Sequence, residues 1–212
     1  MIKFSNTSVM NFENAIRGMR NPLQSWEKND SAYIIDAKHP GHYFFELGPN
    51  DLKLATSLRK AGSDHRKYLR QIFVSVDITA PLYLWKELDT YKIGTVANST
   101  STMHTIHRKK FSRDDFSCDQ MSGHNLAVLD YVILNLNLYR ELFLNTNEKQ
   151  HWYDMIQLLP SSYNQMRTVT MNYENLINMY HARKHHKLQE WHDLCAWIET
   201  LPYAKELIIG GE

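Results

Sequence analysis

The stretch LRQIFVSVDITAPLYLWKELDTY, residues 69–91, decides the fold class. In its first half apolar and polar residues alternate, with Ile72, Val74 and Ile78 on one side, and this period of two predicts a half-buried strand. Pro81 then stands at a favourable helix start, because its fixed φ suits the first turn. A strand followed at once by a helix predicts a chain that mixes α and β structure.

Helix dominates the rest of the chain. We expect helices at residues 11–20, 51–62, 82–91, 125–144, 152–159, 173–182 and 187–199, and a second strand at residues 165–171. Asn50 is the expected cap of the second helix. Residues 23–49 are rich in turn formers, with the clearest break at KHPGH, residues 38–42, and residues 92–104 fit neither period. The sequence therefore predicts an α+β fold in a single domain spanning residues 1–212.

Composition excludes some classes of protein. The 212 residues include 24 Lys+Arg and 23 Asp+Glu, a formal charge of +1. This balance argues against a non-specific nucleic-acid coat protein, which gains affinity from a basic excess. The apolar stretches are too short to span a bilayer, and the start of the chain has no apolar leader. We expect a cytoplasmic protein with neither a membrane nor a nucleic acid as partner.

The segment HARKHHKLQEWH, residues 181–192, is the most concentrated candidate for chemistry. His181 and His185 stand four residues apart, a spacing at which two imidazoles on a helix can hold one metal ion. The HExxH pattern is absent and the spacing shows no third ligand, so we expect no metal. A solvated helix end explains the histidines equally well. The local charge of RKHHK suits a single nucleotide phosphate better than a nucleic acid.

Other common catalytic signatures are missing. Cys195 lies in an apolar helical pattern and is expected in the core, and Cys118 has no histidine positioned beside it by the sequence. No GxSxG, P-loop or GxGxxG motif occurs. The hydroxyl-rich residues 92–104 are either a cradle for a polar ligand or an ordinary capped connection.

Taken in chain order, these pieces resemble flavin-dependent thymidylate synthases. That family places a strand, an Ala-Pro helix and the motif Arg-His-Arg-x-x-Ser-x-Asn-Glu-x-Ser-x-Arg. Here the corresponding segments are APLYLWKE at residues 80–87, TYKIGT at 90–95 and NSTSTM at 98–103. Further along, Asn172 ends the second strand and a helix leads to Arg183, in the family's order. The similarity covers about residues 9–200, with one extra residue before the NSTSTM segment.

Several arginines of the family pattern are replaced. Thr90, Tyr91 and Lys92 stand where the family has Arg-His-Arg. The motif's glutamate is Ser99, its last arginine is Met103, and Glu174 replaces an arginine expected after Asn172. In the family these arginines hold nucleotide and flavin phosphates, and a lysine does not reproduce their planar, two-point recognition.

The resemblance implies a small antiparallel sheet surrounded by helices, a homotetramer and a defined chemistry. A dUMP-like pyrimidine nucleotide would be methylated at C5, with FAD as cofactor and NADPH and methylenetetrahydrofolate as co-substrates. By carry-over, the catalytic residues are Ser101 and Arg183. The flavin site is lined by His65, Lys92, Asn98 and Asn172, and the substrate site by Lys86, Glu87, Ser99, Ser101 and Arg183. Two alternatives stay open: another C5 modification such as hydroxymethylation, and a non-catalytic nucleotide-binding scaffold.

Overall fold

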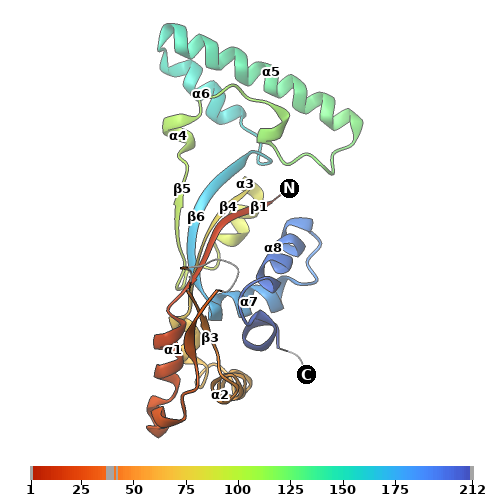
Figure 1. The fold of residues 1–212 in the computed structure, drawn as a ribbon. Coiled ribbons are helices and arrows are strands. Elements are labelled where there is room, and N and C mark those ends of the chain that lie inside the picture. The colour runs from red at the N-terminus through yellow and green to blue at the C-terminus, as the bar shows by residue number, and fades with distance from the viewer. Residues whose placement is uncertain (1, 37–40, 42, 211–212) are drawn as a thin grey trace. The chain divides into compact units, whose positions relative to one another are not determined.

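One sheet of four strands organises the computed structural model, which describes residues 2–36, 41 and 43–210. Its strands follow the order β1 (Lys3–Met10), β4 (Phe73–Pro81), β6 (Asn164–Asn172) and β5 (Val96–Ser99), as Figure 1 shows. The sheet is antiparallel and accompanied by helices. The predicted α+β class with a small antiparallel sheet is therefore confirmed.

The helices largely follow the predicted segments. They are α1 (Phe12–Met19), α2 (Pro49–Lys60), α3 (Leu82–Leu88), α4 (Thr102–Thr105), α5 (Gly123–Thr146), α6 (Lys149–Leu158), α7 (Tyr173–Arg183) and α8 (Gln189–Glu199). A π-helix, η5 (Lys205–Ile209), follows them. The predictions for α1, α2, α3, α5, α6, α7 and α8, and for strands β4 and β6, are confirmed within a few residues.

Two segments that were predicted without regular structure contain short elements. Residues 23–49 contain an antiparallel hairpin of β2 (Ala32–Ile35) and β3 (Tyr43–Glu46), and most of the break expected at 38–42 lies outside the described residues. Residues 92–104 contain β5 and α4. These short strands were missed because most of their side chains are exposed, so no buried face produces an alternating pattern.

The start of α2 also differs from the prediction. Asn50 lies inside the helix, which begins at Pro49 with Gly48 at the cap position. The capping acceptor is the carboxylate of Asp30, which accepts from the amide nitrogens of Asn50 at 2.8 Å and Asp51 at 3.0 Å. A distant side chain therefore performs the role that the sequence pattern assigned to Asn50.

Contacts divide the chain into two compact units, and the single domain expected from the sequence stays a prediction. Unit 1 comprises Met1–Ser5, Asp77–Tyr91 and Ala97–Val169, and unit 2 comprises Asn6–Val76, Lys92–Val96 and Thr170–Glu212.

The core of unit 1 lies where α5 packs along α6 (Figure 1). From α5, Leu129, Ile133 and Leu136 are buried, and they meet Met155 of α6 and Phe116 from the preceding loop. The opposite face of α5 is apolar but exposed. It carries Val128, Tyr131, Leu134 and Leu138, each more than half exposed.

The core of unit 2 gathers around α7 and α8. Tyr173 and Trp191 are both fully buried, and the Tyr173 hydroxyl donates to the carbonyl of Pro202 at 2.7 Å. Its ring meets Phe12 of α1 edge to face, with centroids 5.6 Å apart. Burial of these large rings fixes α1, α7 and α8 against one another. None of the helices described in either unit has the length and apolarity needed to cross a bilayer.

Candidate functional site

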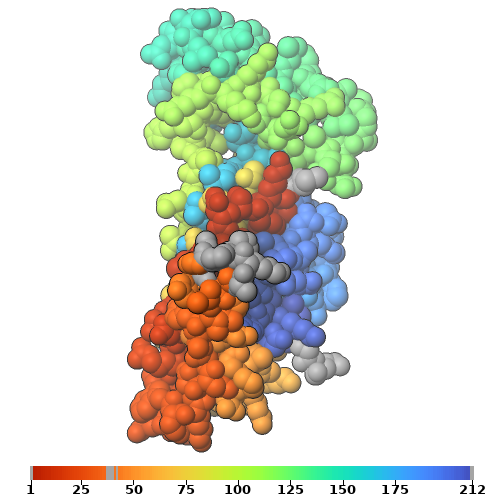
Figure 2. Space-filling view, in the orientation of Figure 1, coloured from red at the N-terminus to blue at the C-terminus, as the bar shows by residue number. Residues whose placement is uncertain are grey.

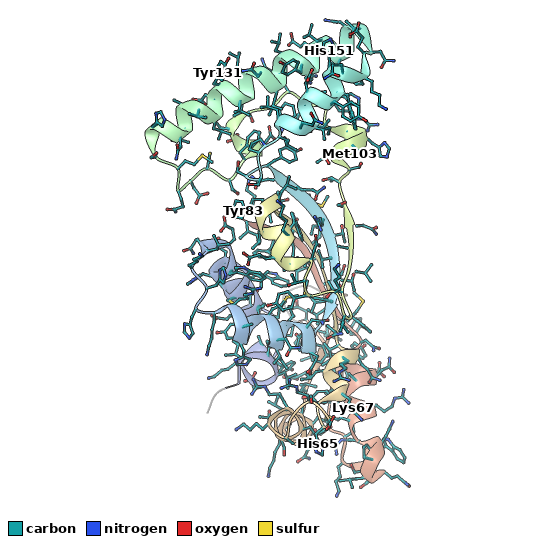
Figure 3. All side chains as sticks on the ribbon, turned by 180° about the vertical axis from the view of Figure 1, so that it is seen from behind. His65, Lys67, Tyr83, Met103, Tyr131 and His151 are labelled. Atoms are coloured by element: carbon teal, nitrogen blue, oxygen red, sulfur yellow. The ribbon has the colours of Figure 1, made fainter. Side chains whose placement is uncertain are left out.

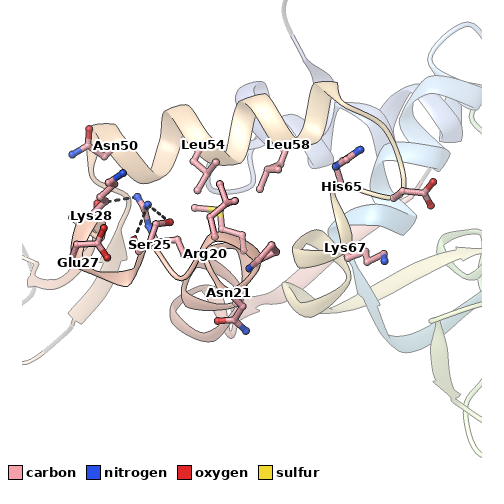
Figure 4. A pocket seen from close by; sticks show the side chains of 15 residues that line it. Arg20, Asn21, Ser25, Glu27, Lys28, Asn50, Leu54, Leu58, His65 and Lys67 are labelled. Carbon is pink, nitrogen blue, oxygen red and sulfur yellow. Dashed lines mark hydrogen bonds between the residues drawn. The ribbon is translucent and has the colours of Figure 1, made fainter.

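A large cavity lies along one side of α2, within unit 2. It has a volume of about 1070 Å³, at the upper end of the range for ligand and cofactor sites. We call it the α2 pocket. Figure 4 shows Leu54 and Leu58 facing it from α2, with Arg20 and Asn21 on the other side and His65 and Lys67 at one end. An apolar side with polar groups at the ends suits an extended, partly aromatic ligand.

One wall of the α2 pocket is built on a buried ion pair. The Nε of Arg20 donates to Oδ1 of Asp51 at 2.6 Å, and both side chains are almost fully buried. The guanidinium also donates to the carbonyls of Ser25 and Lys28, while Oδ2 of Asp51 accepts from Ser31. Because each charge has several partners, burial does not leave either unsatisfied. The network fixes the loop after α1 against the start of α2.

The other end of the α2 pocket contains the first predicted site residue. His65 lies there beside Lys67, at the entry to the 3-10 helix η3 (Lys67–Gln71), and both side chains are exposed (Figure 3). Asp64 lies next to them. The predicted flavin residue thus lines a cavity of suitable size, while Lys67 was not identified from the sequence.

Two further predicted flavin residues are brought close together elsewhere in unit 2. The side chain of Asn172 accepts from the backbone nitrogen of Asn175 at 3.0 Å and so caps α7. Nδ2 of Asn175 in turn donates to the carbonyl of Ile93 at 2.7 Å. This bond holds the segment containing the exposed Lys92 at the start of α7.

An ion pair that the sequence did not reveal joins Arg66, the residue before η3, to α7. Arg66 donates to both carboxylate oxygens of Glu174, from Nε at 2.9 and 3.1 Å and from Nη2 at 3.0 Å. Glu174 is buried, and 108 positions separate the partners in the chain. Glu174 is the residue that replaces an arginine of the family pattern. A guanidinium is therefore still present beside this position, supplied by the neighbour of His65.

The predicted catalytic arginine lies at the end of α7. The guanidinium of Arg183 stands over the ring of Trp191, 4.6 Å from the centroid, a cation–π arrangement. His192 Nε2 contacts the carbonyl of His186, and Nδ1 of His186 accepts from the amide of Leu188 at 3.2 Å. Much of the histidine-rich segment thus stabilises the turn between α7 and α8. Among the described residues, no three metal-ligating side chains gather at one point.

The predicted residues of unit 1 lie on α3, β5 and α4. Lys86, Asn98 and Ser99 are exposed, and Glu87 is half-buried. The Oγ of Ser101 accepts from the amide of His104 at 3.2 Å, so this predicted catalytic serine caps α4.

The two cysteines have the surroundings of structural residues. Cys195 is buried in α8, as predicted, and desolvation raises the pKa of its thiol to about 11. A thiol with this pKa is protonated at neutral pH and is a poor nucleophile. Cys118 is partly buried against the core of unit 1.

Comparison with solved structures identifies the architecture. A crystal structure of thymidylate synthase X from Helicobacter pylori with FAD and dUMP matches with a TM-score of 0.68 and 20% identity, covering 98% of this chain and 97% of that one. The chain has the thymidylate synthase X fold. A second structure of the flavin-dependent enzyme from Helicobacter pylori, complexed with FAD and dUMP, gives a TM-score of 0.67 at 19% identity, over 95% of each chain. In sequence, neither a protein-family model nor a curated protein matches.

The predicted roles of the site residues stay predictions, and the structure gives only their positions. His65 and Asn172 were named, and the structure places the first in the α2 pocket and the second at the start of α7. Arg20, Asp51 and Arg66 were missed. No sequence pattern indicated these three residues, because each acts through a partner at least 31 positions away in the chain.

Proposed function

We propose that this chain is a diverged flavin-dependent thymidylate synthase-like enzyme that methylates dUMP at C5. The supporting observation is the match of nearly the whole chain to a fold crystallised with FAD and dUMP, combined with a large pocket that contains His65. NADPH and methylenetetrahydrofolate are the co-substrates that this proposal requires. When bound, the flavin would supply the hydride chemistry, and the protein would supply orientation and electrostatics.

The α2 pocket fits a flavin cofactor in size and in chemistry. Leu54 and Leu58 offer an apolar surface for a flat ring, and His65 and Lys67 offer donors and positive charge for an anionic tail. Lys92, Asn98 and Asn172 are the further flavin residues of this proposal. The α2 pocket has a volume of about 1070 Å³, which is large enough for such a cofactor, so flavin binding is the first property to test.

The first experiment measures flavin binding directly. The protein is incubated with FAD, freed of excess cofactor, and examined by visible absorbance and by fluorescence titration. We expect retained flavin, and weaker retention in His65→Ala than in the matched variant His124→Ala, which changes an exposed histidine of α5. Absence of flavin binding by the wild-type chain would contradict the proposed enzyme.

Arg183 is the proposed anchor of the nucleotide, with Lys86, Glu87, Ser99 and Ser101 as further substrate residues. A hydrogen bond to a charged group contributes roughly 1.5–3 kcal/mol, so Arg183→Ala should weaken dUMP binding about 10- to 150-fold. Arg183→Lys should restore only part of this loss, because the fork geometry is missing. Calorimetric titration with dUMP and dCMP measures the effect, and equal affinities of wild type and variant would remove Arg183 from the site.

One observation favours the non-catalytic alternative. Glu174, at an arginine position of the family pattern, places a negative charge where phosphate recognition is expected, and this charge is tied to Arg66. A scaffold that binds nucleotide without turnover would show dUMP binding but no product. Mass spectrometry of the nucleotide after incubation with all co-substrates distinguishes methylation, hydroxymethylation and absence of reaction.

The proposed assembly is a homotetramer. The exposed apolar face of α5, with Val128, Tyr131, Leu134 and Leu138, is larger than isolated surface residues would form. Figure 2 shows the C-terminal part of α5 together with α6 at the surface, in teal. Association through this face would bury it. Sedimentation should give a species larger than a monomer, and Leu134→Glu should shift it toward the monomer.

A further inference from the structure

A second cavity, in unit 2, is lined largely by basic side chains. It has a volume of about 620 Å³ and lies where the C-terminal end of α2 meets α7 and η5. Arg59 and Lys60 line it from α2, and His181 lines it from α7. Arg66 completes the set from the segment before η3. We call it the basic pocket.

Within the described part of the chain, positive charge exceeds negative charge at the basic pocket. Among the residues that the structure describes, Glu174 is the carboxylate that forms an ion pair with one of these cations, and its partner is Arg66. Arg59 and Lys60 contribute two further full charges at the end of α2. Part of this charge stabilises the helix terminus, because cations there oppose the helix dipole. The helix dipole does not account for the presence of four basic groups around one cavity.

Arg59 is held in place but incompletely satisfied. Its Nη2 donates to the carbonyl of Ile208 at 2.7 Å and lies 3.3 Å from Nε2 of His181. Its Nε is buried and has no hydrogen-bond partner in the described part of the chain. The backbone of Gly210, at φ +69°, runs so close to the guanidinium that a Cβ would lie 1.9 Å from Nη1. The guanidinium is therefore positioned in advance of any ligand.

The neighbouring imidazole responds to the same excess of charge. Desolvation lowers the pKa of His181, although a backbone hydrogen bond with Ile208 opposes this change. The positive charges of Arg59, Arg66 and Lys184 lower the pKa further. A bound anion would offset this repulsion, so that His181 could be protonated and donate a second charged hydrogen bond.

We propose that the basic pocket binds a phosphate-type oxyanion, held by Arg59 and His181 with Lys60 and Arg66 supplying further charge. A phosphate has several acceptor oxygens and matches convergent donors of this kind. The observations that carry the proposal are the four converging basic groups and the unpartnered Nε of Arg59. It does not rest on the proposed synthase activity, because the basic pocket and the α2 pocket are lined by different residues.

The test is calorimetric titration of the full chain with inorganic phosphate in a chloride buffer of low ionic strength. Arg59→Gln should weaken binding about 10- to 150-fold, since a charged hydrogen bond is lost. Because Arg59 also bonds to Ile208, this variant is paired with Lys60→Gln, an exposed change that should weaken binding roughly two- to fivefold. Lys53→Gln removes the same charge from an exposed position of α2 outside the pocket and should leave affinity unchanged.

Two outcomes would overturn the proposal. One is the absence of saturable phosphate binding by the wild-type chain, and the other is an equal loss of affinity in Lys60→Gln and Lys53→Gln, which indicates diffuse surface charge. A competition arm identifies the source of the phosphate. If saturating inorganic phosphate weakens dUMP binding in the wild type but not in Arg59→Gln, the basic pocket takes the phosphate of a nucleotide. Independent binding of the two in the wild type assigns the basic pocket to free phosphate. Flavin retention is measured in the same variants, so failure of the proposed enzyme and failure of this site are distinguishable.

Discussion

The α2 pocket and the basic pocket are both lined by α2, but they differ in whether their cations are paired with carboxylates. In the α2 pocket the buried Arg20 is neutralised by Asp51, and the exposed lining carries acids as well as bases. In the basic pocket Arg59 and Lys60 have no matching carboxylates among the described residues. A buried charge depends on its partner, because removing that partner leaves the charge uncompensated, whereas a charge in excess at a pocket remains available to a ligand.

The largest expected effect is the loss of stability when the ion pair at the α2 pocket is removed. Asp51→Ala leaves the buried Arg20 without its main partner and should lower the free energy of unfolding by about 3–5 kcal/mol. Equilibrium unfolding in urea measures the loss. Asp64→Ala, an exposed change in the same pocket, should stay within about 0.5 kcal/mol of wild type. A similar stability in both variants would contradict the structural role of the ion pair.

A charge placed on the apolar side of the α2 pocket should separate the two sites functionally. Leu54→Arg puts a large cation where a flat ring is proposed to lie, so flavin affinity should fall about tenfold or more. Phosphate affinity should be unaffected. Leu54→Met conserves volume and serves as the control. Fluorescence titration with FAD checks the prediction, and loss of flavin binding in both variants would point to general disruption.

An increase in the net positive charge of the basic pocket should raise its affinity for phosphate. Glu174→Gln keeps an oxygen acceptor for Arg66 but removes the negative charge that offsets it. Phosphate affinity should then rise roughly three- to tenfold, because the guanidinium is no longer neutralised. Calorimetry with inorganic phosphate gives the value, and a thermal melt confirms that the variant is folded. Weaker binding in a folded variant would show that Glu174 positions Arg66 for the anion.

The smallest expected effect is a dependence on pH. The pKa of His181 is lowered in the folded chain, so below the unfolded value near 6.5 the unfolded chain binds more protons at this site. Stability should fall as pH decreases through that range, by only a few tenths of a kcal/mol, because the side chain is exposed and screened. The difference between wild type and His181→Gln in urea unfolding at pH 7.5 and 5.5 isolates this effect. Saturating phosphate should reduce it.

The sequence predicted those elements whose burial leaves a periodic pattern. β4 alternates buried and less buried residues, and Pro81 marks the start of α3, so both were identified. β5 has four exposed residues and pairs at the sheet edge, so its existence depends on β6 and not on its own side chains. The local sequence of β5 does not indicate that it pairs with β6.

The residues of the candidate site also divide into those that local sequence could indicate and those that depend on distant partners. His65 and Arg183 were named by the positions they hold in the chain order that resembles the family. Arg66 adjoins His65, yet its role depends on Glu174, which lies in another helix. The basic pocket likewise combines the end of α2 with α7 and the residues of η5. Sites made by the meeting of distant elements become visible only once the fold has placed those elements.

The capping of α2 by Asp30 has a consequence for the order of folding. Gly48 has no side chain to cap the helix, and a Cβ at this position would lie 2.2 Å from Cγ of Asp30. The first turn of α2 is therefore completed only when the loop carrying Asp30 has closed onto it. Helix nucleation is unfavourable, and the hydrogen bonds from Asp30 that offset its cost form only after the loop has closed. We therefore expect α2 and the loop to form in a single late step. Any larger residue at position 48 would uncouple them, and folding would slow more than unfolding would accelerate if this step belongs to the transition state.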